Sequence, residues 1–206
     1  MNVLTDRIKE IFANPLYPIV ILTLFLLFLG FMKIRKTKIT TRVMTQIAMS
    51  LAIAVILSFF KFIQMPQSGS VTPGDMVPIL LIAIIYGPEI GLLTGFTFGI
   101  ITLIIEPSIV HPIQLLLDYP LAFMALGLAG YFKRNKYFAV TVGIFGRFLC
   151  HFISGVVFFG SYAPVGQSVY LYSLIYNGFY LSIDFIICMV IIGLLPIKRF
   201  ENLLKK

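Results

Sequence analysis

The chain has 206 residues, of which 59% are apolar and only 12% are charged, and its mean hydropathy is +1.00. Because a soluble domain carries about 25% charged residues, a chain with half that share cannot cover itself with polar surface and must be surrounded by lipid. The net charge of +8 does not indicate nucleic-acid binding, because the basic residues lie in short clusters between apolar runs.

Seven apolar segments are candidates for helices that cross the membrane, since a crossing needs about 20 mainly apolar residues. In chain order they are residues 16–32, 43–63, 76–85, 90–105, 112–132, 137–159 and 170–195. The third is short for a crossing, and Gly87 and Pro88 separate it from the fourth. The predicted fold class is therefore all-α, a polytopic membrane helical bundle.

Three basic clusters predict the orientation of these segments. They follow the first, fifth and seventh segments, and they consist of Lys33, Arg35, Lys36, Lys38 and Arg42, then Lys133, Arg134 and Lys136, then Lys198, Arg199, Lys205 and Lys206. An even number of crossings separates them, so all three fall on one side, which the positive-inside rule makes cytoplasmic. We expect a multi-pass protein of the cell membrane with its N-terminus outside and its C-terminus in the cytoplasm.

The first segment could instead be a cleaved signal peptide. Its basic cluster follows the apolar run, and no small-residue cleavage site is visible. The segment before it balances its acids Asp6 and Glu10 against Arg7 and Lys9, so nothing there holds the N-terminus in the cytoplasm. These features favour a retained helix.

Polar residues gather in the outer half of the last three segments. They are His111, Gln114, Asp118 and Tyr119 in the fifth, Arg147 and His151 in the sixth, and Tyr170, Tyr172, Tyr176 and Asn177 in the seventh, with Asp184 deeper. Ionisable residues at membrane depth cost a few kcal/mol each, and they are candidates for function by default. An acid among aromatic faces predicts a pocket, open to the outside, for a flat cationic or aromatic solute.

Each of these residues also has a structural interpretation. Asp118 could form a buried ion pair with Arg147, and His151 could be a satisfied core histidine. The tyrosines could belong to the interfacial aromatic belt, and Asn177 could join two helices by hydrogen bonds.

Two rows of small residues allow close helix approach. Ala48 and Ala52 form one in the second segment, with Ala54 nearby, and Gly91, Gly95 and Gly99 form a longer one in the fourth. Each row could serve internal packing or could be a docking face for another membrane subunit.

Motifs for enzyme chemistry are scarce. The sequence has no phosphate-binding Gly-Lys-Ser/Thr loop and no Cys/His cluster with metal spacing, so we expect no metal and no cofactor. An intramembrane hydrolase using His151 and Ser154 is a weaker alternative, because Ser154 lacks a nucleophile-elbow context. We also see no filter loop or ring of like charge, which a channel would show.

Four stretches resemble a known family. They are residues 65–71, 111–119, 147–164 and 172–177, which read MPQSGSV, HPIQLLLDY, RFLCHFISGVVFFGSYAP and YSLIYN. They are similar to the thiamine-specific substrate-binding subunits of energy-coupling factor transporters, the ThiT/YuaJ family. The resemblance covers about residues 43–195 and leaves out the first segment.

The resemblance implies a six-helix substrate-binding domain over residues 43–206, preceded over residues 1–42 by an extra transmembrane helix and a basic linker. It also implies a non-catalytic function. The chain would bind thiamine from outside and deliver it together with a coupling membrane subunit and two ATPase subunits. A subunit of the same type for a thiamine precursor or another cationic heterocycle is the alternative.

The resemblance also carries residue roles. It implies that the ligand contacts are Asp118, Tyr119, His151, Phe159, Tyr172 and Asn177, and that Ala48 and Ala52 contact the coupling subunit. Some family members have Glu at the position of Asp118 and stack thiamine on tryptophans, whereas this chain has Phe159 and no Trp at all.

Overall fold

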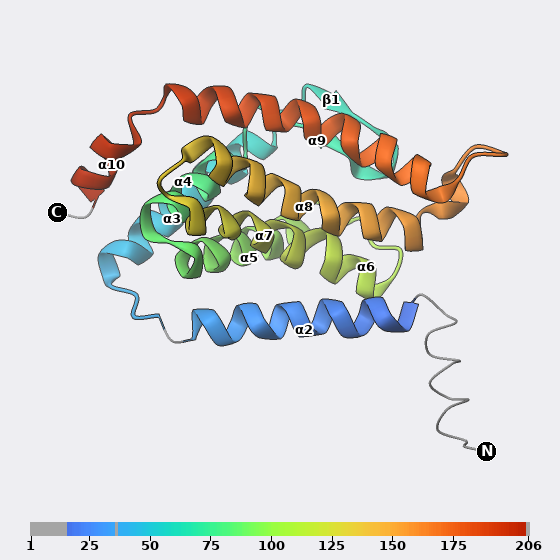
Figure 1. Ribbon diagram of the computed structural model, residues 1–206, viewed down its shortest axis with the longest axis horizontal. Helices are drawn as coiled ribbons and strands as arrows, with labels where there is room; N and C mark the ends of the chain where they lie inside the picture. Colours follow the sequence, from blue (N-terminus) through green and yellow to red (C-terminus); the bar gives the residue numbers. More distant parts are fainter. Residues whose placement is uncertain (1–15, 36, 205–206) are drawn as a thin grey trace, which may run out of the picture.

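The computed structural model describes residues 16–35 and 37–204 (Figure 1). The long helices are α2 (Leu16–Ile34), α3 (Thr41–Ser58), α4 (Val77–Tyr86), α5 (Pro88–Ile105), α8 (Lys136–Phe158) and α9 (Val169–Leu194). Between α5 and α8 the chain runs through α6 (Pro112–Leu116), η2 (Leu117–Leu121), α7 (Ala122–Ala125) and η3 (Leu126–Phe132), and it ends in α10 (Ile197–Leu204). The predicted N-terminal charges, Lys36, Lys205 and Lys206 lie outside the described residues.

Each of the seven predicted segments coincides with helical structure, which confirms the all-α membrane fold. Within the described residues, five helical stretches are long and apolar enough to cross a membrane, and the helices Pro18–Ile34 and Val77–Tyr86 are apolar but shorter. The exterior agrees with a lipid environment, because large apolar side chains such as Phe28, Met49 and Ile186 are each more than half exposed.

The structure differs from the predicted segments at three points. The second segment was expected to reach residue 63, but α3 ends at Ser58, and the chain then forms a small antiparallel hairpin of β1 (Ile63–Gln64) and β2 (Ser70–Val71) around the turn η1 (Pro66–Ser68). The fifth segment is broken rather than uniform, because η2 is π-helical around Pro120. The short helix α10 was not predicted.

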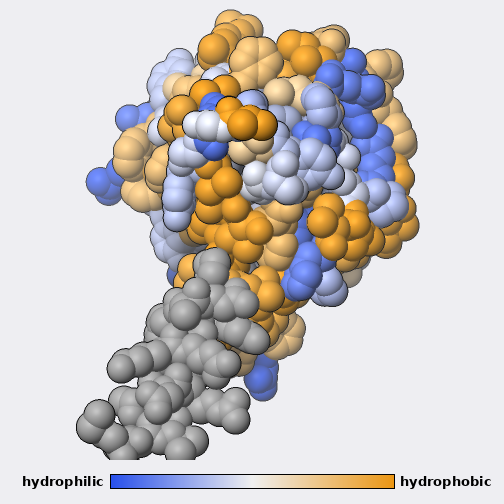
Figure 2. Space-filling model, turned by 90° about the vertical axis from the view of Figure 1, so that its right-hand side faces the viewer, coloured by the Kyte–Doolittle hydropathy of each residue, from blue (hydrophilic) through white to orange (hydrophobic). Residues whose placement is uncertain are grey.

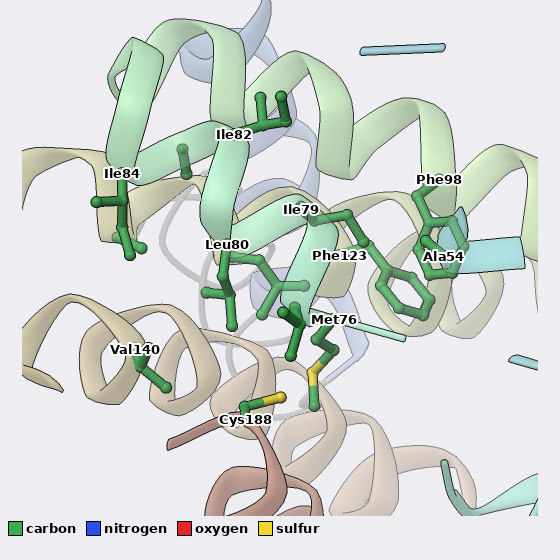
Figure 3. Close-up of a cluster of buried hydrophobic side chains, with 14 of the residues drawn as sticks. Ala54, Met76, Ile79, Leu80, Ile82, Ile84, Phe98, Phe123, Val140 and Cys188 are labelled. Carbon is green, nitrogen blue, oxygen red and sulfur yellow. The ribbon is translucent and has the colours of Figure 1, made fainter. Parts of the chain in front are cut away.

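Helix α4 forms the centre of the bundle (Figure 3). Ile79, Leu80 and Ala83 are fully buried, so this helix is covered by protein on all sides rather than by lipid. That burial explains how a helix of 10 residues serves in a membrane protein. Nearby, the rings of Phe98 and Phe123 meet edge to face with centroids 4.7 Å apart.

The glycine row of α5 serves internal packing. A Cβ atom on Gly95 would lie 2.1 Å from the carbonyl oxygen of Phe123, and one on Gly99 would lie 2.5 Å from that of Tyr119. The backbone of α5 therefore lies directly against the broken helix that carries Asp118. This is the small-residue packing that replaces the hydrophobic effect inside lipid.

The alanine row of α3 has the opposite placement. Ala48 and Ala52 are exposed on the outside of the bundle, whereas Ala54 is fully buried. Internal packing therefore accounts for Ala54 and leaves the row of Ala48 and Ala52 open to lipid or to a partner.

Candidate ligand pocket

One cavity collects all six side chains for which the sequence predicts ligand contact. They are Asp118, Tyr119, His151, Phe159, Tyr172 and Asn177, and they come from η2, α8, the residue after α8, and α9. The hairpin of β1 and β2 and the end of α5 complete the wall. Figure 2 shows the end of the molecule at which α6 and α9 begin, where hydrophilic residues gather across the middle among apolar ones.

The carboxylate of Asp118 is held by three side-chain donors. Its Oδ2 accepts hydrogen bonds from Gln114 Nε2 at 2.7 Å and from Ser154 Oγ at 2.8 Å. Its Oδ1 lies 3.1 Å from Nδ1 of His151. Asp118 and His151 are each 13% exposed, so the acid is fixed in position and still accessible from the cavity.

Arg147 determines which nitrogen of His151 carries the proton. Its Nε lies 3.3 Å from Nε2 of His151, and a guanidinium is only ever a donor. Nε2 therefore accepts, and Nδ1 carries the hydrogen that faces Asp118. Arg147 is thus linked to Asp118 through His151, and no direct ion pair joins the two among the described residues.

Acidic and basic side chains both line the cavity. The acidic ones are Asp75, Glu106 and Asp118, and the basic ones are Lys61 and Arg147. Lys61 forms an ion pair with Glu106 near the rim. Asp118 is accessible from the cavity and is the acid that suits a cationic ligand.

The π-helical segment η2 places Asp118 and Tyr119 on the cavity wall. Pro120 has no N–H to continue a regular helix, and the wider turn accommodates it. The hydroxyl of Tyr119 accepts from the backbone N–H of Ser108 at 2.8 Å and donates to the carbonyl of Glu106 at 2.9 Å. Tyr119 therefore offers its ring to the cavity, while its hydroxyl holds the connection between α5 and α6.

Gln114 is almost completely buried and supports the acid from behind. Its Oε1 accepts from the N–H of Val110 at 3.0 Å, and its Nε2 donates to the carbonyl of Ser108 at 3.1 Å as well as to Asp118. One amide thus couples the conformation of the connecting loop to the position of the Asp118 carboxylate.

Two tyrosines of α9 hold the hairpin over the cavity. The hydroxyl of Tyr176 donates to the carbonyl of Pro66 and accepts from the N–H of Gly69 at 3.1 Å. The hydroxyl of Tyr172 donates to Oε1 of Gln67 at 3.4 Å. Gln67 has a φ of 55°, which is uncommon for a non-glycine residue, so these bonds hold a strained turn. No pattern in the sequence predicts this tether.

Asn177 lines the cavity and also joins α8 to α9. Its Nδ2 donates to the carbonyls of Ser173 at 3.0 Å and His151 at 3.2 Å, and its Oδ1 accepts from the hydroxyl of Tyr180 at 3.3 Å. The structure therefore contains both arrangements considered for Asn177, because the residue lines the cavity and also joins two helices by hydrogen bonds. Phe159 follows the last residue of α8, and its ring lies 6.1 Å from that of Tyr162.

Sequence reasoning named Asp184 but missed Thr72 and Asp75, which line the cavity. The N–H of Thr72 donates to Oδ1 of Asp184 at 3.0 Å, and its hydroxyl donates to Oδ1 of Asp75 at 2.8 Å. Nearby, Nη1 of Arg147 is buried and has no hydrogen-bond partner among the described residues. An acid directly before an apolar helix, as Asp75 is before α4, was the available signal.

Comparisons with known proteins bear on this pocket. Residues 44–204 match the family model described as thiamine transporter protein (Thia_YuaJ). The chain belongs to the Thia_YuaJ family. Two relatives, each named thiamine transporter ThiT, are 41% identical over 88% of the protein of Bacillus subtilis (strain 168) and 32% identical over 87% of that of Lacticaseibacillus paracasei, and each match covers 73% of this chain.

A solved structure supports the same fold. The chain matches a structure of ThiT from Listeria monocytogenes with a TM-score of 0.70 at 24% identity, over 79% of this chain and 96% of the other. The Thia_YuaJ family consists of transporters, so this chain is a multi-pass membrane transport protein and not an enzyme. The hydrolase alternative is wrong, and the hydroxyl of Ser154 instead donates to Asp118.

The Thia_YuaJ match contains all six predicted ligand contacts and both alanines of the α3 row. It begins at residue 44, after the end of α2.

Proposed function

We propose that this chain is the substrate-capture subunit of an energy-coupling factor importer and that it binds thiamine from the extracellular side. The observation that carries the proposal is the Asp118 carboxylate, held by three donors on the wall of the cavity. The two relatives are both named thiamine transporters, which supports the choice of ligand.

The chemistry of thiamine suits this cavity. Its thiazolium ring carries a permanent positive charge, which Asp118 neutralises. Its rings are flat and stack on Phe159 and Tyr172 at the cavity mouth, and cation–π contact contributes about 0.5–2 kcal/mol per ring. The second lone pair of Asn177 Oδ1 accepts a hydrogen bond from the amino group of the aminopyrimidine, and His151, whose two nitrogens are bonded to Arg147 and Asp118, presents the face of its ring. Tyr119 contributes its ring to the wall.

Transport requires partners, because the sequence contains no phosphate-binding loop with which to hydrolyse ATP. We propose that a coupling membrane subunit docks on the exposed row of Ala48 and Ala52 and that two ATPase subunits drive release inside. The outward placement of these alanines supports a docking role, since small residues let a second helix approach closely.

The orientation is part of the proposal. The pocket lies at the end of the molecule where α6 and α9 begin, and the described basic residues Lys133, Arg134 and Lys198 follow the other ends of their spans. The positive-inside rule then places the pocket outside and the C-terminus in the cytoplasm. We assign residues 1–42 to an additional helix with its linker and residues 43–206 to the binding domain.

The test is calorimetry on the purified protein without any ATPase. Thiamine, its separate aminopyrimidine and thiazolium halves, and an unrelated cationic heterocycle are titrated in turn. Saturable binding that is tightest for intact thiamine supports the proposal. Tighter binding of one half or of the other heterocycle would transfer the assignment to that ligand, and a folded sample that binds none of them would refute it.

A further inference from the structure

Helix α2 lies along the bundle (Figure 1). A single stripe of its residues is buried. Thr23 and Gly30 are buried on that stripe, and Leu27 between them is partly buried. The other side is exposed, as Phe28 and Leu29 show at 57% and 46%. Spacings of three and four residues define one helix face, so α2 is docked along its length and is not a loose leader.

The stripe packs against the segment that carries the ligand-binding acid. α2 contacts α5, α6 and η2, and Leu27 packs on an apolar cluster that includes Leu117, Leu121 and Met124. At Gly30 the approach is close, because a Cβ atom there would lie 2.8 Å from Sδ of Met124. Glycine therefore allows the two helices to meet at this point.

The C-terminal end of α2 is also fixed. Lys33 donates a hydrogen bond to the hydroxyl of Tyr131 on η3, and its Nζ lies 3.9 Å from Oε1 of Glu89 on α5. These contacts hold the C-terminal end of α2 against η3 and α5.

The segment under α2 is the irregular one. In η2, Leu117 and Leu121 face the cluster with α2, whereas Asp118 faces the cavity. Pro120 interrupts the regular helical hydrogen bonds, so packing from behind has more influence on this turn than on a regular helix.

We propose that α2 is a positioning element that holds the π-helical segment and thereby fixes the Asp118 carboxylate for ligand binding. α2 lies outside the region matched to the family, so this support belongs to this chain rather than to the family domain. It also leaves the row of Ala48 and Ala52 exposed. The inference rests on the proposed capture of thiamine.

The test separates positioning from general stabilisation. Gly30→Leu prevents the close approach to Met124, Thr23→Leu disturbs the same stripe, and Leu29→Phe on the lipid side is the control. Each full-length variant is placed in lipid nanodiscs, and thiamine affinity and ligand-free melting temperature are measured. We expect Gly30→Leu and Thr23→Leu to weaken thiamine binding about tenfold, a 1.4 kcal/mol effect, and Leu29→Phe to leave it unchanged.

A double-mutant cycle with Asp118→Asn decides the route of the effect. If α2 acts through Asp118, Gly30→Leu has little further effect on affinity once Asp118 is Asn. Additive losses, or a lower melting temperature with unchanged affinity, would overturn the inference. Lys33→Gln repeats the cycle with a milder change in case Gly30→Leu does not fold. Failure of the wild-type protein to bind thiamine would refute the proposed function itself.

Discussion

Asp118 Oδ1 and His151 Nδ1 lie 3.1 Å apart, and Arg147 approaches the opposite nitrogen of the same imidazole at 3.3 Å. The three residues form a chain in which a guanidinium sets the tautomer of a histidine, and the histidine donates to the acid. Asp118 has no cation in direct contact, so its carboxylate is available to a positively charged ligand.

Replacement of Arg147 by Lys should therefore affect thiamine binding much less than replacement of Asp118 by Asn. Lysine keeps the positive charge and can still donate toward His151. We expect less than about a tenfold loss of affinity for Arg147→Lys, measured by calorimetry. If Arg147 were the essential partner of Asp118, the two variants would lose affinity equally.

Gln114 should matter although it is not expected to touch the ligand. Gln114→Ala removes three hydrogen bonds and leaves the N–H of Val110 and the carbonyl of Ser108 without this partner. Each lost hydrogen bond costs about 0.5–1.5 kcal/mol, so both the melting temperature and the thiamine affinity should fall. An unchanged affinity in this variant would show that the loop does not support Asp118.

Two glycines in helix interiors provide a matched pair. A Cβ atom on Gly95 would lie 2.1 Å from a backbone oxygen, whereas nothing lies within 4 Å of one on Gly178. Overpacking costs about 1–3 kcal/mol, so Gly95→Ala should markedly lower the melting temperature in nanodiscs. Gly178→Ala should leave it unchanged or raise it. Equal melting temperatures for the two variants would contradict the packing of α5 described above.

The hairpin tether should control how long the ligand stays bound. Tyr176→Phe removes the hydroxyl that joins Pro66 and Gly69 to α9 while keeping the ring. We expect faster thiamine dissociation in a stopped-flow displacement experiment, with a smaller change in association. Tyr170→Phe is the control, because Tyr170 is 63% exposed at the start of the same helix. The same dissociation rate in both variants would show that the tether does not retain the ligand.

The sequence was sufficient for the membrane segments, because each depends on a local run of apolar residues. It also placed Asp118, His151 and Asn177 toward the same side of the membrane, and all three line one cavity, while their contact with a ligand stays a prediction. It could not reveal the contact of Thr72 with Asp184, which joins residues 112 positions apart, or the tether of the hairpin to Tyr176. These contacts depend on how the helices pack and leave no periodic pattern.

The broken helix shows the same limit at shorter range. Pro120 lies inside the fifth segment, which was predicted as one continuous helix, and a proline alone does not determine whether the chain kinks, ends or widens. The glycine row of α5 packs against this stretch, with Gly99 next to the backbone of Tyr119, and the π-helical turn occurs there. The outcome therefore depends on a neighbouring helix as much as on the proline.

The central claim is that Asp118 recognises the positive charge of thiamine in the isolated chain. The most direct measurement compares calorimetric binding of thiamine with that of an isosteric analogue whose thiazolium is replaced by a neutral ring, for the wild-type protein and for Asp118→Asn. We predict that the wild type prefers thiamine by about 10- to 100-fold, as for a charged hydrogen-bonded contact of about 1.5–3 kcal/mol, and that Asp118→Asn loses most of this preference. An equal preference in both proteins would contradict the account.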